Sequence, residues 1–174
     1  MMMRMLEKGG MPILTDGLRR ADDDNPLGYY EFEPVKRLDR DTSWLLDACN
    51  KAVKIIYIFL YNLPRDHRYK VLFMKRHLDE IVASQKVMLR RRQEGDRMSD
   101  RDLMDKFDDE LQRLDLWIRQ QDNFTISYLD YDEVVAEPAK TAVWISRFLG
   151  LKLDTEAMAR AVDPSLHRNR SVEV

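Results

Sequence analysis

Short apolar runs alternate with amphipathic segments along most of the chain. Four of the runs are rich in β-branched or aromatic residues and are bounded by turn residues or charges, a pattern typical of buried strands. They are residues 11–15, 51–57, 69–74 and 124–129. Because strands that alternate with helices usually build a parallel sheet with helices on its faces, the pattern predicts an α/β fold.

Apolar residues at helical spacing predict the helices around these strands. They fall in residues 2–6, 78–89, 103–118, 143–149 and 154–163. Gly9-Gly10 and Gly150 are expected to end two of the helices, and Asp154 to cap the start of another. No capping residue precedes the first helix, so the chain is expected to open inside a helix. Residues 29–33, aromatic and acidic, fit either an edge strand or an ordered loop.

Length and composition fit one domain over residues 1–174, since 44% hydrophobic residues suffice for one sizeable core. Lys and Arg number 29 and Asp and Glu 31, a formal net charge of -2, which leaves no global electrostatic ground for nucleic-acid binding. The longest apolar run, residues 55–60, is far shorter than the ~20 residues that cross a bilayer. The single cysteine, Cys49, excludes an internal disulfide. We therefore expect a cytoplasmic protein without a membrane or nucleic-acid partner.

A basic segment surrounds the end of the third predicted strand. In residues 65–92, nine Lys or Arg side chains accompany three acids. Arg76 lies just past the strand and Ser84 eight residues later in the following helix, where strand ends and helix N-termini commonly bind anions. Arg and Ser both donate to phosphate oxygens, which favours a terminal phosphate as the anion. The alternative is a solvated helix face on which Arg76 pairs with Asp79 or Glu80.

Three segments combine into a pattern that extends over nearly the whole chain. Residues 73–84 read FMKRHLDEIVAS, residues 131–138 read YDEVVAEP and are followed by FLGL at 148–151, and residues 25–31 read NPLGYYE. The first resembles the 3′-phosphate-binding segment of sulfotransferases that use 3′-phosphoadenosine 5′-phosphosulfate (PAPS). The second resembles their Tyr-Glu-Asp-Leu and Phe-Leu-Gly pattern, and the third a segment of bacterial members. The chain is thus similar to a bacterial-type PAPS-dependent sulfotransferase.

The resemblance implies a three-layer, P-loop NTPase-like fold with a central parallel sheet, and PAPS as co-substrate. Arg76 and Ser84 then hold the 3′-phosphate of PAPS, and Arg168 or Arg170 in the basic tail closes over it. A frayed basic terminus is the alternative for the tail. No metal is implied, and the histidines lack the spacing of metal ligands. The implied reaction moves a sulfuryl group from PAPS to a hydroxyl or amine of an acceptor.

The acceptor side of such a reaction needs a base and a cation. Asp16 occupies the position that resembles the catalytic Glu of tyrosylprotein sulfotransferases, with an Asx-turn before Gly17 as the alternative. Lys54 falls where cytosolic members carry Val-Lys-Thr-His, and there the Lys contacts the transferred sulfuryl group. A strand-edge charge is the alternative for Lys54. Ile56 stands where those members have the His, so a carboxylate is expected to serve as base, with Glu31 as the second candidate.

The family begins with a strand and a Pro-Arg-Ser-Gly-Thr-Ser loop that holds the 5′-phosphosulfate, and neither has a counterpart in this sequence. Residues 1–6 resemble the helix that follows this loop. The resemblance therefore implies a native start upstream of Met1 and predicts that the 174-residue chain alone does not catalyse transfer. A non-catalytic protein of the same fold is one alternative. A nucleotide kinase-like P-loop enzyme is another, although the sequence lacks Gly-x-x-x-x-Gly-Lys-Ser/Thr.

Overall fold

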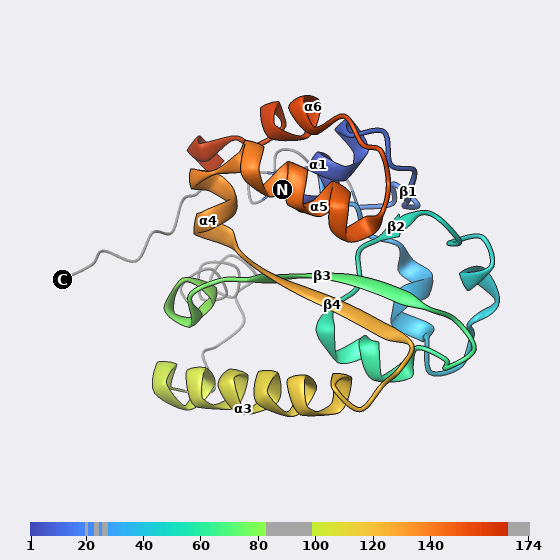
Figure 1. Ribbon diagram of the computed structural model, residues 1–174. Coiled ribbons are helices and arrows are strands. Elements are labelled where there is room, and N and C mark those ends of the chain that lie inside the picture. Colours follow the sequence, from blue (N-terminus) through green and yellow to red (C-terminus); the bar gives the residue numbers. More distant parts are fainter. Residues whose placement is uncertain (20, 23–24, 26–27, 83–98, 167–174) are drawn as a thin grey trace. The chain divides into compact units, whose positions relative to one another are not determined.

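The computed structural model describes residues 1–19, 21–22, 25, 28–82 and 99–166 (Figure 1). The chain divides into a first unit, Met1–Arg68 with Glu133–Asp163, and a second unit, Tyr69–Asp132 with Pro164–Val174. The first unit contains α1 (Met2–Lys8), β1 (Ile13–Leu14), the 3-10 helices η1 (Glu33–Arg37), η2 (Ser43–Leu45) and η3 (Tyr57–Asn62), β2 (Ala52–Val53), α5 (Pro138–Leu149) and α6 (Thr155–Arg160). The second contains β3 (Tyr69–Lys75), α3 (Asp100–Ile118), β4 (Phe124–Asp130) and η4 (Pro164–Leu166). Helix α4 (Tyr131–Ala136) begins in the second unit and ends in the first.

Helices α1, α5 and α6 form the core of the first unit, and Figure 1 shows them grouped together. Met5 of α1, Ile145 of α5 and Met158 of α6 have no exposed surface. α1 and α6 approach closely at Gly9, whose carbonyl accepts a hydrogen bond from the backbone N–H of Asp154 (3.1 Å). A Cβ at Gly9 would lie 2.6 Å from Cγ of Met158, so the approach requires a residue without a side chain.

The helix ends of the first unit follow the predicted signals. α1 stops at Gly9, as expected from the two glycines. α5 ends at Gly150, which has φ 69° and therefore adopts the left-handed conformation that glycine tolerates best. The side chain of Asp154 accepts a hydrogen bond from the N–H of Ala157 (2.9 Å) and caps α6. These three predictions are confirmed.

Strands β1 and β2 pair in parallel over two residues each, Ile13 with Ala52 and Leu14 with Val53. Both strands are shorter than predicted. After β1 the chain turns to the 28–33 loop, because the Thr15 hydroxyl and the next backbone N–H both donate to the Glu31 carbonyl (2.8 and 3.3 Å). The prediction of a strand as far as residue 57 is wrong, since η3 begins there once β1 no longer supplies a pairing edge.

Strands β3 and β4 pair in parallel over their whole length, from Tyr69 opposite Phe124 to Lys75 opposite Asp130. They confirm the strands predicted at 69–74 and 124–129. Of the helix predicted at 78–89, residues 78–82 are helical and the remainder lies outside the described residues.

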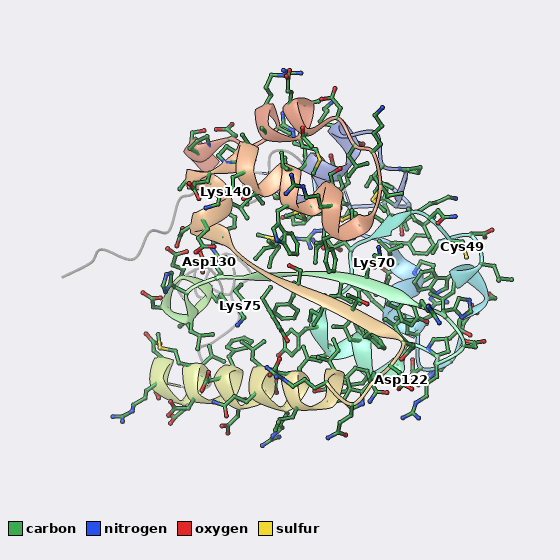
Figure 2. The ribbon with its side chains drawn as sticks, viewed as in Figure 1. Cys49, Lys70, Lys75, Asp122, Asp130 and Lys140 are labelled. Atoms are coloured by element: carbon green, nitrogen blue, oxygen red, sulfur yellow. The ribbon has the colours of Figure 1, made fainter. Side chains whose placement is uncertain are left out.

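Helix α3 runs along one side of this strand pair (Figure 1). Trp117 packs edge to face on Phe124, with ring centroids 5.4 Å apart. The hydroxyl of Tyr128 donates to Oδ1 of Asp115 (2.6 Å), which fastens the middle of β4 to the helix. Lys75 lies on the same side, its ammonium group 4.4 Å from the Tyr128 ring centroid (Figure 2). One face of the pair is therefore covered by α3.

Helices combined with parallel strand pairs give a mixed α/β architecture, which confirms the predicted class at this level. Among the described residues, no helix is both long enough and apolar enough to cross a membrane.

We predict that Gly9→Ala destabilises the fold. Gly9 has φ -74°, which alanine adopts without strain, so the effect isolates the steric contact with buried Met158. Overpacking of this kind costs about 1–3 kcal/mol of the free energy of unfolding. Urea denaturation followed by circular dichroism measures it.

Met158→Ala provides the matched background for this test. With the long side chain removed, the added methyl group has room, and Gly9→Ala should lose most of its effect. Lys8→Ala, an exposed change in the same turn, should stay within about 0.5 kcal/mol of the parent. An equal loss from Gly9→Ala in both backgrounds would contradict the close-approach argument.

Candidate functional site

The ends of β1 and β2 bring the three predicted catalytic residues into one neighbourhood. Because the two strands are parallel neighbours, the chain leaves both at the same edge. Asp16 lies two residues past β1 and Lys54 directly follows β2. The backbone N–H of Asp16 donates to the carbonyl of Glu31, which brings in the third. We call Asp16, Arg19, Tyr29, Glu31 and Lys54 the strand-end cluster.

The Lys54 ammonium group is held by the 28–33 loop and stays accessible. Its Nζ donates to the carbonyl oxygen of Tyr29 (3.0 Å) and lies 3.9 Å from Oε1 of Glu31. Partial burial lowers the pKa of Lys54, the charge of Glu31 opposes this shift, and the charge of Arg19 adds to it. Because the side chain is still 40% exposed, an anion can approach the ammonium group.

Arg19 is a member of the cluster that sequence reasoning missed. Its Nη1 lies 2.8 Å from Oε1 of Glu31, and its guanidinium carbon lies 3.3 Å from the centroid of the Tyr29 ring. Arg19 and Lys54 thus share one carboxylate oxygen, which leaves this group of three with an excess positive charge. No sequence signal marked Arg19, since twelve residues and no regular element separate it from Glu31.

Asp16 uses its carboxylate to hold the backbone. Oδ1 accepts from the N–H of Leu18 (3.0 Å), and Oδ2 accepts from the N–H of Glu33 (2.5 Å). These two hydrogen bonds hold the pKa of Asp16 below its ordinary value of 3.8. The Asx-turn alternative is therefore what the structure contains, and the same side chain also secures the loop that carries Glu31. A role for Asp16 as a base stays a prediction.

A second contact fixes this loop to α1. Tyr30 has φ 53°, a left-handed backbone conformation that costs a residue with a Cβ about 1–2 kcal/mol. Its hydroxyl donates to Oε2 of Glu7 (2.7 Å). Burial, together with this hydrogen bond, raises the pKa of Tyr30 to about 12. The phenol is therefore a structural anchor that stays protonated, and it holds the neighbouring Glu31 in place.

Trp44 lies in the core and packs behind this loop. It is 7% exposed and packs edge to face on Phe32, with centroids 5.2 Å apart. Its indole N–H has no hydrogen-bond partner among the described residues. Through Phe32, the residue after Glu31, Trp44 contributes to the packing of the loop.

The first residue of the chain lies within electrostatic range of the cluster. Burial lowers the pKa of the Met1 amino group, and the charges of Lys54 and Arg4 lower it further. Helix α1 also contacts β2, the strand that Lys54 follows.

In the second unit, Arg76 follows β3 and pairs with a buried acid. Its Nε lies 3.0 Å from Oε2 of Glu80, whose side chain is 2% exposed. The guanidinium carbon lies 4.6 Å from the ring centroid of Tyr131, the first residue after β4. The ion pair that sequence reasoning held as the alternative is present. The terminal nitrogens of Arg76 make no hydrogen bond with any described residue.

The remaining predicted cofactor residues, Ser84, Arg168 and Arg170, lie outside the described residues. Within the described ranges, no three His, Cys, Asp or Glu side chains gather as a group able to hold a metal ion. Comparisons with models of known protein families, with curated proteins and with solved structures found no match.

We predict that Asp16→Asn lowers the free energy of unfolding at neutral pH by about 1 kcal/mol. The amide has one acceptor oxygen and satisfies one of the two backbone donors, so a single hydrogen bond is lost. Urea denaturation at pH 7 measures the difference.

The pH dependence gives the control. A carboxylate whose pKa is depressed on folding stabilises the protein above its unfolded pKa, and this stability is lost as the pH falls through the folded pKa. The gap between parent and Asp16→Asn should therefore narrow below about pH 3.8. A gap that stays constant at low pH would show that the carboxylate hydrogen bonds do not stabilise the loop.

Proposed function

We propose that this chain is a sulfotransferase that moves a sulfuryl group from PAPS to a hydroxyl or amine of an acceptor. The observation that carries the proposal is the contact between Lys54 and Glu31, with Nζ and Oε1 3.9 Å apart. The sequence singled out the first as the cation for the transferred group and the second as a candidate base, on separate grounds. Sulfuryl transfer requires both functions beside one reacting centre.

The start of α1 supports the same centre. The resemblance puts the phosphosulfate of the donor at the helix that residues 1–6 resemble. Helix α1 contacts β2, the strand that Lys54 directly follows, so the cation expected at the sulfuryl group comes from the strand next to that helix.

Side chains of this chain can supply the base and the cation that the proposed transfer needs. An acceptor oxygen or nitrogen forms a bond to sulfur while the bond from sulfur to the 5′-phosphate oxygen breaks, and the acceptor proton passes to a carboxylate. Both oxygens of Asp16 are engaged by backbone donors, whereas Oε2 of Glu31 makes no hydrogen bond with a described residue. We therefore assign the base role first to Glu31 and second to Asp16. Lys54 would stabilise the charge that develops on the sulfuryl oxygens and the leaving phosphate.

Arg76 suits the 3′-phosphate of PAPS. Glu80 engages only its Nε, so the terminal nitrogens keep the planar fork that binds phosphate oxygens. The buried carboxylate orients this fork, and the Tyr131 ring lies beside it. Ser84, eight residues on, is proposed as the second donor, with Arg168 or Arg170 from the tail.

For the chain as a whole we propose the three-layer, P-loop NTPase-like fold, formed as one domain in the cytoplasm. Parallel pairing in both described strand pairs supports it, since that fold is built on a parallel sheet.

We predict that Arg76→Ala weakens binding of adenosine 3′,5′-bisphosphate by about tenfold to a hundredfold. Hydrogen bonds from a charged group contribute about 1.5–3 kcal/mol, which corresponds to that change in affinity. Isothermal titration calorimetry on the 174-residue chain measures the dissociation constant.

Two further variants serve as controls for this measurement. Arg76→Lys keeps a cation beside buried Glu80 and loses the fork, so its affinity should fall between parent and alanine variant. Arg119→Ala removes an exposed cation of the same unit, paired with Asp115, and should bind as the parent does. Equal affinity in all four proteins would remove Arg76 from the phosphate site.

We predict that Glu31→Gln lowers kcat by about 10²–10⁴, the usual contribution of a general base. Asp16→Asn should lower it less, because its main effect is on the loop. Transfer is measured with the chain extended by the strand and loop that the resemblance implies. A larger loss for Asp16→Asn at equal folded fraction would reverse the assignment, and small losses for both would exclude a carboxylate base.

A further inference from the structure

Arg19 is fixed on two sides within the strand-end cluster. Its Nη1 donates to Oε1 of Glu31 (2.8 Å), and its guanidinium carbon lies 3.3 Å from the centroid of the Tyr29 ring. The hydroxyl of Tyr29 in turn donates to Oδ1 of Asp22 (2.7 Å), so the ring that supports the guanidinium group is itself held in place. An ion pair between side chains that are 38% and 28% exposed contributes little to stability. Its effect is therefore expected on the orientation of Glu31 rather than on the fold.

Arg19 is the closer of the two cations that share Oε1 of Glu31. Nζ of Lys54 lies 3.9 Å from this oxygen, beyond hydrogen-bond distance, and donates to the carbonyl oxygen of Tyr29 (3.0 Å). A guanidinium group binds a carboxylate through a planar set of N–H donors, whereas an ammonium group acts as a point charge. Without Arg19, Lys54 would be the remaining cation of the cluster, and the carboxylate would be drawn toward it. Arg19 therefore keeps Glu31 and Lys54 apart.

This separation matters for both groups that the proposed transfer needs. Arg19 engages Oε1 of Glu31, whereas Oε2 makes no hydrogen bond with a described residue and can receive the acceptor proton. Because Arg19 holds Glu31, the ammonium group of Lys54, 40% exposed, can turn to an anionic sulfuryl group without first breaking a close ion pair. A carboxylate that closed on Lys54 would block both functions together.

We propose that Arg19 is a positioning residue that holds Glu31 in the orientation of a base and keeps Lys54 available to the sulfuryl group. The inference rests on the sulfotransferase assignment and adds a residue that lies outside the motifs of the resemblance. With water as the acceptor, the water oxygen forms a bond to sulfur and the bond from sulfur to the 5′-phosphate oxygen breaks. One water proton passes to Oε2 of Glu31. Arg19 takes no part in these bond changes.

Two other roles for Arg19 predict different results. If Arg19 bound the substrate directly through its other terminal nitrogen, its loss would raise KM. If Arg19 only fastened the loop, its loss would lower the free energy of unfolding and leave kcat of the folded protein unchanged. A positioning role predicts a lower kcat with little change in KM, because proton transfer and the charge that develops at the sulfuryl group belong to the transition state.

The first measurement uses the chain extended by the implied strand and loop, with PAPS alone and water as the acceptor. Arg19→Met keeps the aliphatic stem beside Tyr29 and removes the charged fork. Its kcat should fall about tenfold to a hundredfold, since small displacements of a catalytic group have effects of this size. Arg19→Lys keeps the charge and should retain more of kcat. Arg40→Met, a change at an exposed arginine that pairs with Asp39, is the matched control and should leave kcat unchanged.

The results separate this inference from the sulfotransferase proposal. If the parent turns over PAPS and Arg19→Met has an equal kcat, or a higher KM as its only change, the positioning role is overturned and the sulfotransferase assignment stands. If the folded parent does not turn over PAPS, the sulfotransferase assignment itself fails. The second measurement then decides whether Arg19 separates Glu31 from Lys54.

The second measurement follows the charge of Lys54 in the 174-residue chain and needs no turnover. Burial lowers the pKa of Lys54, Glu31 raises it, and Arg19 lowers it. The charge of Lys54 also acts on the Met1 amino group, which is present in every variant. Because Glu31 would move toward Lys54 in Arg19→Met, this variant should raise the pKa of Lys54. NMR titration of the reductively ¹³C-methylated protein, with Lys54→Arg for assignment, measures it.

The Glu31→Gln background is the control for this titration. Loss of the Arg19 charge, or a more exposed Lys54, would raise the pKa of Lys54 in either background. A contribution through Glu31 requires the carboxylate, so Arg19→Met should raise this pKa less in the Glu31→Gln background than in the parent. An equal rise in both backgrounds, or no rise in the parent, would overturn the inference.

Discussion

Parallel strand pairing is the constraint on which both candidate sites depend. In a parallel pair the two strands end at the same edge, so residues that follow each strand meet there although they are far apart in sequence. The β1–β2 pair does this for Asp16 and Lys54 with only two residues in each strand. The β3–β4 pair does the same for Arg76 and Tyr131 over a seven-residue register. The residues that directly follow each strand therefore determine which chemistry is possible at that edge of the pair.

In the first unit, side chains of the connecting loop complete what the short strands begin. A two-residue pair fixes little by itself, and the loop that carries Glu31 includes a left-handed Tyr30. Asp16 and Glu7 supply acceptors that hold this loop from two sides. Glu31 is consequently presented to Arg19 and Lys54 in a defined position. Hydrogen bonds to the carboxylates of Asp16 and Glu7 thus hold the loop that places these charged side chains next to one another.

Features encoded by neighbouring residues could be predicted from the sequence. The cap at Asp154 and the helix stop at Gly150 depend on side chains and φ values within one turn, and both are confirmed. The strand at 51–57 was overestimated because a strand extends only as far as a partner edge does, which local composition does not encode. Arg19 was not predicted as a site residue because its partner, Glu31, lies twelve residues later in the chain and local composition does not encode such a contact. Lys54 and Glu31 were found separately, yet nothing in the sequence stated that they touch.

The contacts of α3 carry a consequence for the order of folding. Asp115 and Tyr128 meet across thirteen residues of chain, whereas the paired residues of β3 and β4, such as Tyr69 and Phe124, are about 55 residues apart. Closing a short loop costs less conformational entropy than closing a long one. We therefore expect α3 and β4 to associate early as a local helix–strand unit whose uncovered edge is the template for β3. During synthesis on the ribosome, β3 would therefore stay unpaired with β4 until β4 has been synthesised.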